Sequence, residues 1–175
     1  MILLLLATFL SIGFFSNTLN AQDKKDKTEL KSEKAKTAFI QSDASMAKMF
    51  ANAWGYVIFP SVGKGAVVVG GASGNGTVYE KGKVIGTAHM VQASVGPQIG
   101  GKAYREVIFF ETKAALDRFC EKTFAFSAEV AAVAVKSGVS ANARYAEGVA
   151  VFTQAKGGLM ADVSVGGQKF TFKDL

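Results

Sequence analysis

Short apolar runs bounded by glycine are the feature that most constrains the fold of this chain. Residues 54–80, WGYVIFPSVGKGAVVVGGASGNGTVYE, show the pattern best. β-Branched and aromatic residues favour half-buried strands, and glycines permit tight turns between them. We expect strands over Tyr56–Phe59, Ala66–Val69 and Thr77–Tyr79. The first should stop at Pro60, and Asn75-Gly76, a dipeptide typical of two-residue hairpins, should form a turn before the third.

The same pattern continues to the end of the chain. Lys81-Gly82-Lys83 predicts a turn, and Thr112 is placed to cap a short helix over Lys113–Glu121. Further strands are expected over Val84–Val95, Ile99–Phe110, Phe124–Val135, Gly148–Phe152, Leu159–Val165 and Lys169–Phe172. Gly148–Phe152 is similar in sequence to Gly55–Phe59, which indicates two related halves of one closed sheet.

The first 21 residues are typical of an export signal. Ile2–Phe15 is almost wholly apolar but short for a membrane span, and small residues follow it up to Ala21. We expect cleavage after Ala21 and a protein that works outside the cytoplasm; an uncleaved anchor is the alternative. The mature chain then divides into a charged extension, residues 22–35, and a single domain, residues 36–175.

A charged stretch and two amphipathic helices are expected next. Apolar residues at helical spacing predict one helix over Glu29–Gln41 and another over Ala44–Ala53, with Asp43 as the N-cap of the second and Gly55 ending it in the left-handed conformation. The lysines here form a solvated outer face or a surface that also meets anionic lipid headgroups. Interleaved acidic residues between Asp23 and Lys36 cancel most of the lysine charge.

Residue types that carry catalysis or bind metals are scarce. Cys120 is the one cysteine and His89 the one histidine, which excludes internal disulfides, multi-cysteine metal sites and histidine-rich zinc sites. The helical spacing around Cys120 predicts a core residue rather than a nucleophile. We predict no catalytic residue, no metal and no cofactor. The formal charge of +6 favours anionic partners, but the basic residues do not alternate with aromatic ones, so nucleic acid is not expected.

Several glycine-rich motifs occur in a characteristic order. They are Ala53–Pro60, Gly63–Gly65, Val69–Gly71, Gly74–Gly76, Gly96–Gly101, Val107–Phe110, Gly148–Phe152 and Lys156–Leu159. This series resembles the SYLF domain, a lipid-binding module also known as the yeast actin-binding domain family, and the resemblance spans about Lys36–Phe172. It implies an α+β fold, in which a glycine-rich, strongly curved antiparallel or barrel-like sheet carries N-terminal helices and one short helix between strands.

The resemblance also implies a function. A member of this family with an export signal is expected to bind anionic phospholipids at a bacterial envelope membrane without catalysis, and actin is not expected as its partner. Phe39 or Met49 would insert among the lipids. The lysines expected to attract headgroups are Lys31, Lys34, Lys36, Lys48, Lys64, Lys81, Lys83 and Lys102. The alternative is a structural or protein-interaction module of the envelope that binds a protein partner and no lipid, and an enzyme with paired carboxylates is a third possibility.

Overall fold

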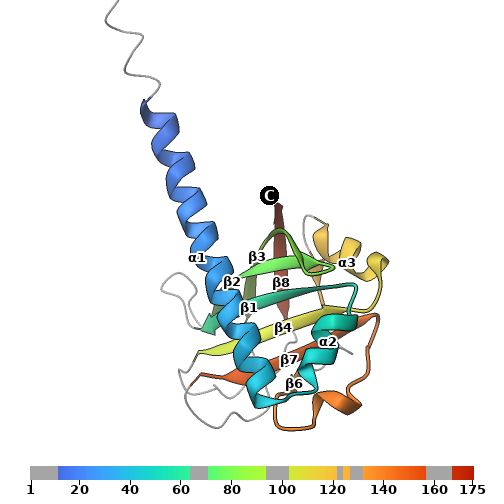
Figure 1. The fold of residues 1–175 in the computed structure, drawn as a ribbon. Coiled ribbons are helices and arrows are strands. Elements are labelled where there is room, and N and C mark those ends of the chain that lie inside the picture. Colours follow the sequence, from blue (N-terminus) through green and yellow to red (C-terminus); the bar gives the residue numbers. More distant parts are fainter. Residues whose placement is uncertain (1–11, 64–70, 94–102, 122–123, 127–131, 157–166) are drawn as a thin grey trace, which may run out of the picture.

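The computed structural model describes residues 12–63, 71–93, 103–121, 124–126, 132–156 and 167–175. Its main feature is an eight-stranded sheet, ordered β5-β8-β3-β2-β1-β4-β7-β6, that curls into a half-barrel (Figure 1). The helical elements are α1 (Ile12–Ser42), α2 (Met46–Asn52), α3 (Lys113–Cys120) and the 3₁₀ turn η1 (Ser140–Asn142). The strands are β1 (Gly55–Gly63), β2 (Gly71–Glu80), β3 (Lys83–Ala93), β4 (Tyr104–Phe110), β5 (Phe124–Ala125), β6 (Ala132–Ala134), β7 (Val149–Ala155) and β8 (Gln168–Asp174). The predicted α+β class with a strongly curved sheet is confirmed.

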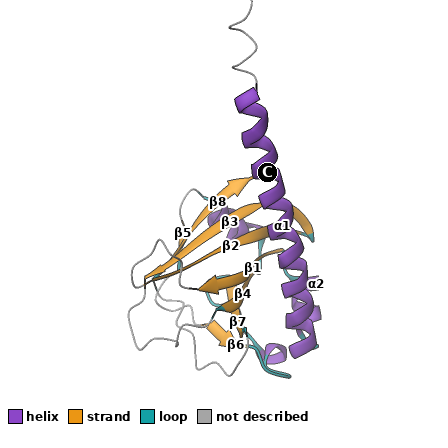
Figure 2. Ribbon diagram, turned by 90° about the vertical axis from the view of Figure 1, so that its left-hand side faces the viewer, coloured by secondary structure: helices purple, strands orange, loops and turns teal. Residues whose placement is uncertain are grey.

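Helix α1 is longer than the predicted Glu29–Gln41, because it starts at Ile12. Its C-terminal half lies across β1 and β2, and its upper part extends beyond the sheet (Figures 1 and 2). Ala35 and Phe39 are buried against the sheet, and the Ser32 hydroxyl donates to the Ile58 carbonyl at 3.3 Å. Within the described residues, no helix is both long and apolar enough to cross a membrane.

The predicted ends of α2 are wrong in detail. The helix starts after Ser45 rather than after Asp43. The Asp43 carboxylate accepts hydrogen bonds from Ser140, which is distant in the sequence. The helix ends because Ala53 turns to extended backbone, at φ −60° and ψ 145°. Gly55 is therefore not needed as a left-handed terminator and is instead the first residue of β1.

Strand β1 does not stop at Pro60, as predicted, but continues to Gly63. The pairing of β1 with both of its neighbours shifts between Ile58 and Val62, which marks an irregularity around the proline. A proline has no N–H for the sheet ladder, so it is tolerated where the pairing is interrupted. The expected strand Ala66–Val69 lies outside the described residues.

The predicted hairpin at Asn75-Gly76 is also wrong, because both residues lie inside the continuous strand β2. Asn75 pairs with His89 and Gly76 with Ala88 of β3. A Cβ on Gly76 would lie 2.7 Å from the Ile58 carbonyl oxygen and 2.8 Å from a Phe59 ring carbon. The glycine is there because the strands approach too closely for a side chain, a requirement that short-range turn statistics do not contain.

Each face of the sheet has its own apolar core. The convex face packs on α1 and α2 through residues such as Phe39, Phe50 and Phe109, whereas the concave face encloses a second cluster closed by Leu116 and Phe119 of α3. Thr112 caps α3 as predicted, since its hydroxyl accepts from the Ala115 N–H at 3.2 Å.

Cys120 at the end of α3 is half-buried against the concave-face core, as its spacing predicted. Burial raises the pKa of its thiol to about 11. The thiolate, which is the nucleophilic form, is therefore disfavoured.

The predicted strand Phe124–Val135 is wrong. Its two ends form the short strands β5 and β6, which lie at opposite edges of the sheet (Figure 2). β5 pairs with β8, and β6 runs parallel to β7 while the other pairings are antiparallel. Because these two edges do not pair with each other, the expected closed sheet is an open half-barrel.

The similar segments Gly55–Phe59 and Gly148–Phe152 lie on either side of one central strand. β1 and β7 flank β4, and Phe110 of β4 pairs with Gly55 on one side and with Val149 on the other. The two registers differ by one residue, so the corresponding Phe59 and Phe152 point into opposite cores and the segments are not equivalent.

The turn between β2 and β3 has the conformation that its sequence predicted. Lys81 and Gly82 have φ of 48° and 78°, and two successive positive values are typical of a two-residue hairpin turn.

We expect Gly82→Ala to lower the free energy of unfolding by about 1 kcal/mol, because left-handed backbone is unfavourable for a residue with a Cβ. Chemical denaturation should show this loss. Lys83→Ala, one residue further in ordinary strand backbone, should change the stability by less than about 0.5 kcal/mol, and an equal loss in both variants would contradict the argument.

Candidate lipid-binding surface

The structure separates the predicted basic site into groups. Lys31 and Lys34 are exposed on α1, Lys48 is exposed on α2, and Lys81 and Lys83 are exposed at the β2–β3 turn. Lys36 on α1 is half-buried, and Lys64 and Lys102 lie outside the described residues. The eight lysines therefore do not form one described site.

The outer side of α1 carries a contiguous basic arc. Lys27, Lys31 and Lys34 recur at intervals of four and three residues, so they share one side of the helix. Leu30 lies beside them and is 58% exposed, which makes it an unusual large apolar side chain on the surface. We call these four residues the α1 basic arc.

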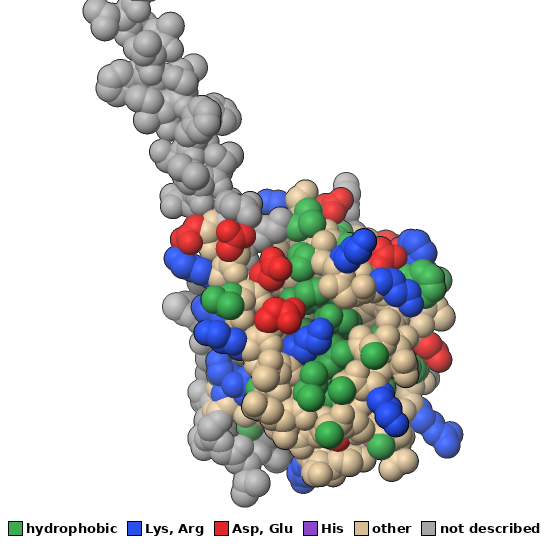
Figure 3. Space-filling model, viewed as in Figure 1, with side chains coloured by type: hydrophobic (Ala, Val, Ile, Leu, Met, Phe, Trp, Pro, Cys, Tyr) green, Lys and Arg blue, Asp and Glu red, His purple; other side chains and the backbone are tan. Residues whose placement is uncertain are grey.

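The acidic residues of α1 lie mostly on a different side from this arc. With about 100° between successive residues, Glu29 and Glu33 fall on the flank that faces away from Lys31 and Lys34. Figure 3 shows basic side chains along the outer edge of α1 and acidic ones on the side toward the middle of the domain. Two acidic residues are exceptions, since Asp23 pairs with Lys27 at 2.6 Å and the exposed Asp26 lies one helical turn before Leu30. Helical geometry thus separates charges that the linear sequence interleaves.

Lys36 belongs to the packing between α1 and the sheet rather than to the basic arc. Its ammonium donates to the Tyr56 hydroxyl at 3.2 Å and lies 5.2 Å and 5.3 Å from the ring centroids of Phe50 and Tyr56. The negative face of an aromatic ring attracts a cation, and a partly desolvated ammonium gains most from this contact.

We expect Lys36→Ala to lower the free energy of unfolding by about 1 kcal/mol, because it removes these ring contacts. Lys34→Ala, on the exposed arc, should change it by less than about 0.5 kcal/mol. Urea denaturation of the two variants is the measurement, and equal stabilities would show that Lys36 has no packing role.

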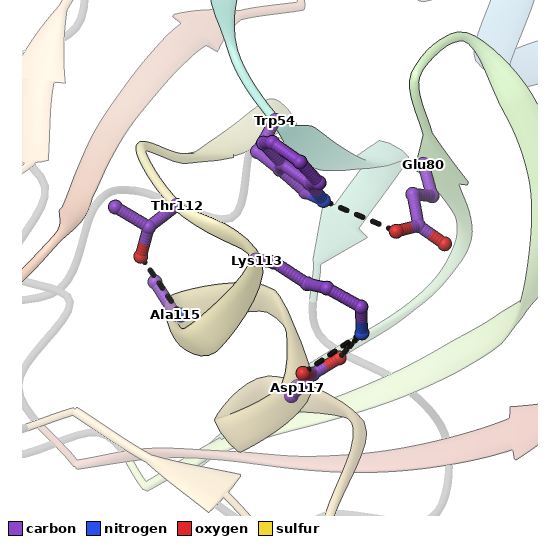
Figure 4. Close-up of polar contacts among 6 residues, drawn as sticks. All are labelled: Trp54, Glu80, Thr112, Lys113, Ala115 and Asp117. Carbon is purple, nitrogen blue, oxygen red and sulfur yellow. Dashed lines mark hydrogen bonds and ion pairs between the residues drawn. The ribbon is translucent and has the colours of Figure 1, made fainter.

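The turn lysines lie at another place, beside α3. The Lys81 ammonium is 4.0 Å from the centroid of the Trp54 ring, and the Trp54 indole N–H donates to Glu80 at 3.1 Å. In Figure 4 this tryptophan lies next to the start of α3, where Lys113 donates to Asp117 at 2.7 Å. These contacts hold the turn against the body of the domain.

The predicted inserting residues are placed differently from the expectation. Phe39 is 0% exposed in the convex-face core, so it cannot enter a bilayer without unfolding, and Met49 is half-buried against the same core. Among the described residues, the exposed large apolar side chains are Leu175 at the C-terminus and Leu30 on α1, and the sequence reasoning missed Leu30. Its place on the polar side of the helix, away from the stripe of Ala35 and Phe39, was the signal that could have identified it.

The described residues offer no arrangement typical of a metalloenzyme. No group of three or more His, Cys, Asp or Glu side chains in this part of the chain could hold a metal ion. His89 is exposed on β3, where its Nδ1 lies 3.0 Å from the Asn75 side-chain oxygen. The surface can offer charge and apolar contact, and these are suited to binding.

Comparison with known proteins agrees with this reading of the fold. Residues 91–174 match the family model of the Las17-binding protein actin regulator, Ysc84. The chain is also 32% identical over 170 residues to Beta cell expansion factor A from Aeromonas veronii, a match that covers 90% of this chain and 62% of that protein. This chain therefore spans less than two thirds of the length of that relative.

Neither the family description nor the name of the relative is that of an enzyme. The later motifs of the predicted series, from Gly96–Gly101 to Lys156–Leu159, lie within the matched residues, and the more extensive match to the relative covers most of the chain. Residues 91–174 of this chain thus match the SYLF (Ysc84) family, in agreement with the resemblance that its glycine-rich motifs indicated.

Proposed function

We propose that this protein binds the surface of membranes that contain anionic phospholipids, and that the α1 basic arc makes the contact. The observation that supports this best is the position of Leu30 among Lys27, Lys31 and Lys34 on a helix side that does not pack on the sheet. An apolar side chain flanked by lysines is the pattern of helices that lie in the headgroup region. The resemblance of the sequence motifs to the lipid-binding SYLF domain, together with the family match over residues 91–174, supports the same proposal.

The charge on the arc is sufficient for reversible binding. Each lysine close to an anionic bilayer contributes about 1 kcal/mol, and the attraction falls off within a Debye length of about 10 Å at 0.1 M salt. Lys27 is partly neutralised by Asp23, so Lys31 and Lys34 should contribute most. Burial of the Leu30 side chain would add roughly 1–2 kcal/mol.

We further propose that the protein is exported and acts in the periplasm or on an envelope membrane, with cleavage after Ala21. The arc begins several residues beyond this position, so cleavage would leave it intact. N-terminal sequencing of the protein recovered from cell fractions tests the location and the cleavage site together.

Liposome flotation tests the binding surface. Protein mixed with neutral vesicles should stay at the bottom of the gradient, and protein mixed with phosphatidylglycerol vesicles should float at low salt but not at high salt. Replacing Lys31 and Lys34 by Gln should weaken binding roughly 30-fold, because two contributions of about 1 kcal/mol are lost. Leu30→Ser should weaken it about tenfold.

The matched control is the double change of Lys169 and Lys173 to Gln on β8. Both are exposed, so the change in net charge is the same on another element. If the two double variants lost vesicle binding equally, net charge rather than the α1 basic arc would determine binding. Absence of flotation with every vesicle would favour the alternative of a protein partner in the envelope.

A further inference from the structure

A layer of buried and half-buried polar side chains crosses the interior of the half-barrel. Its members, which we call the interior polar cluster, are Gln92 of β3, Tyr104 and Glu106 of β4, Thr153 of β7 and Gln168 of β8. The Gln168 amide donates to a Glu106 carboxyl oxygen at 2.9 Å, and the Tyr104 hydroxyl donates to Gln92 at 2.8 Å. In the sheet, β1, β2 and β3 lie between β4 and β8. These hydrogen bonds therefore reach across the concave face and join strands that are not neighbours.

Glu106 is at the centre of this layer and is 0% exposed. One carboxyl oxygen accepts from Gln168, and the other, Oε1, has no partner within the described residues. The same holds for Gln168 Oε1 and for the Thr153 hydroxyl, and Thr153 pairs directly with Glu106 across β4 and β7. The Gln168 side-chain oxygen can only accept, so a Glu106 carboxyl could donate to it, but only if the carboxyl carries a proton.

Among the described residues, the surroundings of Glu106 hold no charge that would stabilise a carboxylate. The described inward-facing residues of β1, β3, β7 and β8 around it are apolar or neutral, and Tyr104 is the other titratable group in the cluster. Burial raises the pKa of Tyr104 well above its ordinary value, so this hydroxyl stays neutral at physiological pH. Burial also raises the pKa of Glu106 to about 7, although the Gln168 hydrogen bond opposes the shift.

We propose that Glu106 is a proton-operated clasp of the half-barrel, which holds β8 and β3 against β4 when the carboxyl is neutral and releases them when it is charged. In the neutral state the O–H can donate to the Gln168 side-chain oxygen, which adds a second hydrogen bond between β4 and β8. Loss of the proton to water removes this second bond and leaves a charge that only the Gln168 amide contacts, with no counter-ion in an apolar interior, which is costly unless water enters. Water reaches Glu106 when the strands that cover it separate, so deprotonation favours an opened sheet. This inference does not depend on lipid binding.

Hydrogen exchange of the backbone amides tests the clasp. After correction for the intrinsic pH dependence, opening of β4 and β8 should rise roughly 30-fold between about pH 5.5 and about pH 8.5, in proportion to the charged fraction of Glu106. Glu106→Gln, which is neutral and of the same shape, should keep the slow exchange at both pH values. Glu111→Gln, an exposed neighbour in sequence, should behave like the wild type.

A carbon-13 titration of the Glu106 carboxyl in the wild-type protein supplies a second measurement, which remains decisive if Glu106→Gln does not fold. A midpoint near the value of about 7 agrees with the clasp, and a midpoint near that of an exposed glutamate would overturn it. Exchange in β4 and β8 that is independent of pH in the wild type, or a pH response that Glu106→Gln retains, would also overturn the proposal.

Discussion

Asp43→Ala is expected to lower the free energy of unfolding by about 3 kcal/mol, because it removes a buried carboxylate that ties three segments together. Asp43 accepts from the Ser45 N–H at 3.0 Å and from the Ser45 hydroxyl at 2.5 Å. It also accepts from the Ser140 N–H at 2.8 Å and from the Ser140 hydroxyl at 2.7 Å. The variant leaves the buried N–H of Ser140 without this acceptor. Equilibrium denaturation in urea measures the loss.

The stability should also show an acid dependence that comes from Asp43. Burial alone would raise the pKa of its carboxyl, but the hydrogen bonds from Ser45 and Ser140 outweigh burial and hold the pKa well below its ordinary value of 3.8. A group with a lowered folded-state pKa stabilises the protein fully above its unfolded-state pKa and loses this contribution as the pH falls further. We expect the urea concentration at the midpoint of unfolding to decrease as the pH is lowered below about 4. This decrease should be less steep in Asp43→Ala than in the wild type.

The control is Asp117→Ala. Asp117 is 58% exposed and pairs with Lys113 on the surface of α3, so its loss should change the stability by less than about 0.5 kcal/mol. If both aspartate variants lost equal stability, or if Asp43→Ala kept the full acid dependence of the wild type, the network around Asp43 would not have the assigned role.

Gly76→Ala is expected to lower the free energy of unfolding by about 2–3 kcal/mol, because a methyl group has no room between β1 and β2. The new Cβ would lie 2.7 Å from the backbone oxygen of Ile58, and a backbone atom cannot move aside as a flexible side chain can. Thermal and urea unfolding measure the loss.

The same substitution at Gly63 serves as its control. A Cβ there would first meet the Ala103 side chain at 3.4 Å, which is ordinary contact. Gly63→Ala should therefore be neutral or stabilising by up to about 1 kcal/mol, since alanine restricts the unfolded chain. A similar loss at both positions would indicate that backbone flexibility, rather than space, explains the glycines of this sheet.

The candidate site shows which features of a helix surface can be predicted from the sequence. The sequence identified Lys31 and Lys34 as basic residues of an amphipathic helix, and the structure exposes both. It treated Lys36 as equivalent, although this lysine, two residues beyond Lys34, points toward Tyr56. It also named Phe39 rather than Leu30 for insertion, because apolar character alone does not tell which side of a helix packs on the sheet.

The sequence by itself determined the strands that alternate or concentrate apolar residues, the capped helix α3 and the Lys81-Gly82 turn, because these depend on neighbours within a few residues. It also indicated the similarity to the SYLF family, since the motifs are local. Only the tertiary structure decided that Asn75-Gly76 lies inside a strand and that Phe124–Val135 divides between two sheet edges. It alone joined Glu106 to Gln168 and Asp43 to Ser140. Each of these features depends on a contact with a strand or loop distant in sequence, and the space or hydrogen bond offered there outweighs local preference.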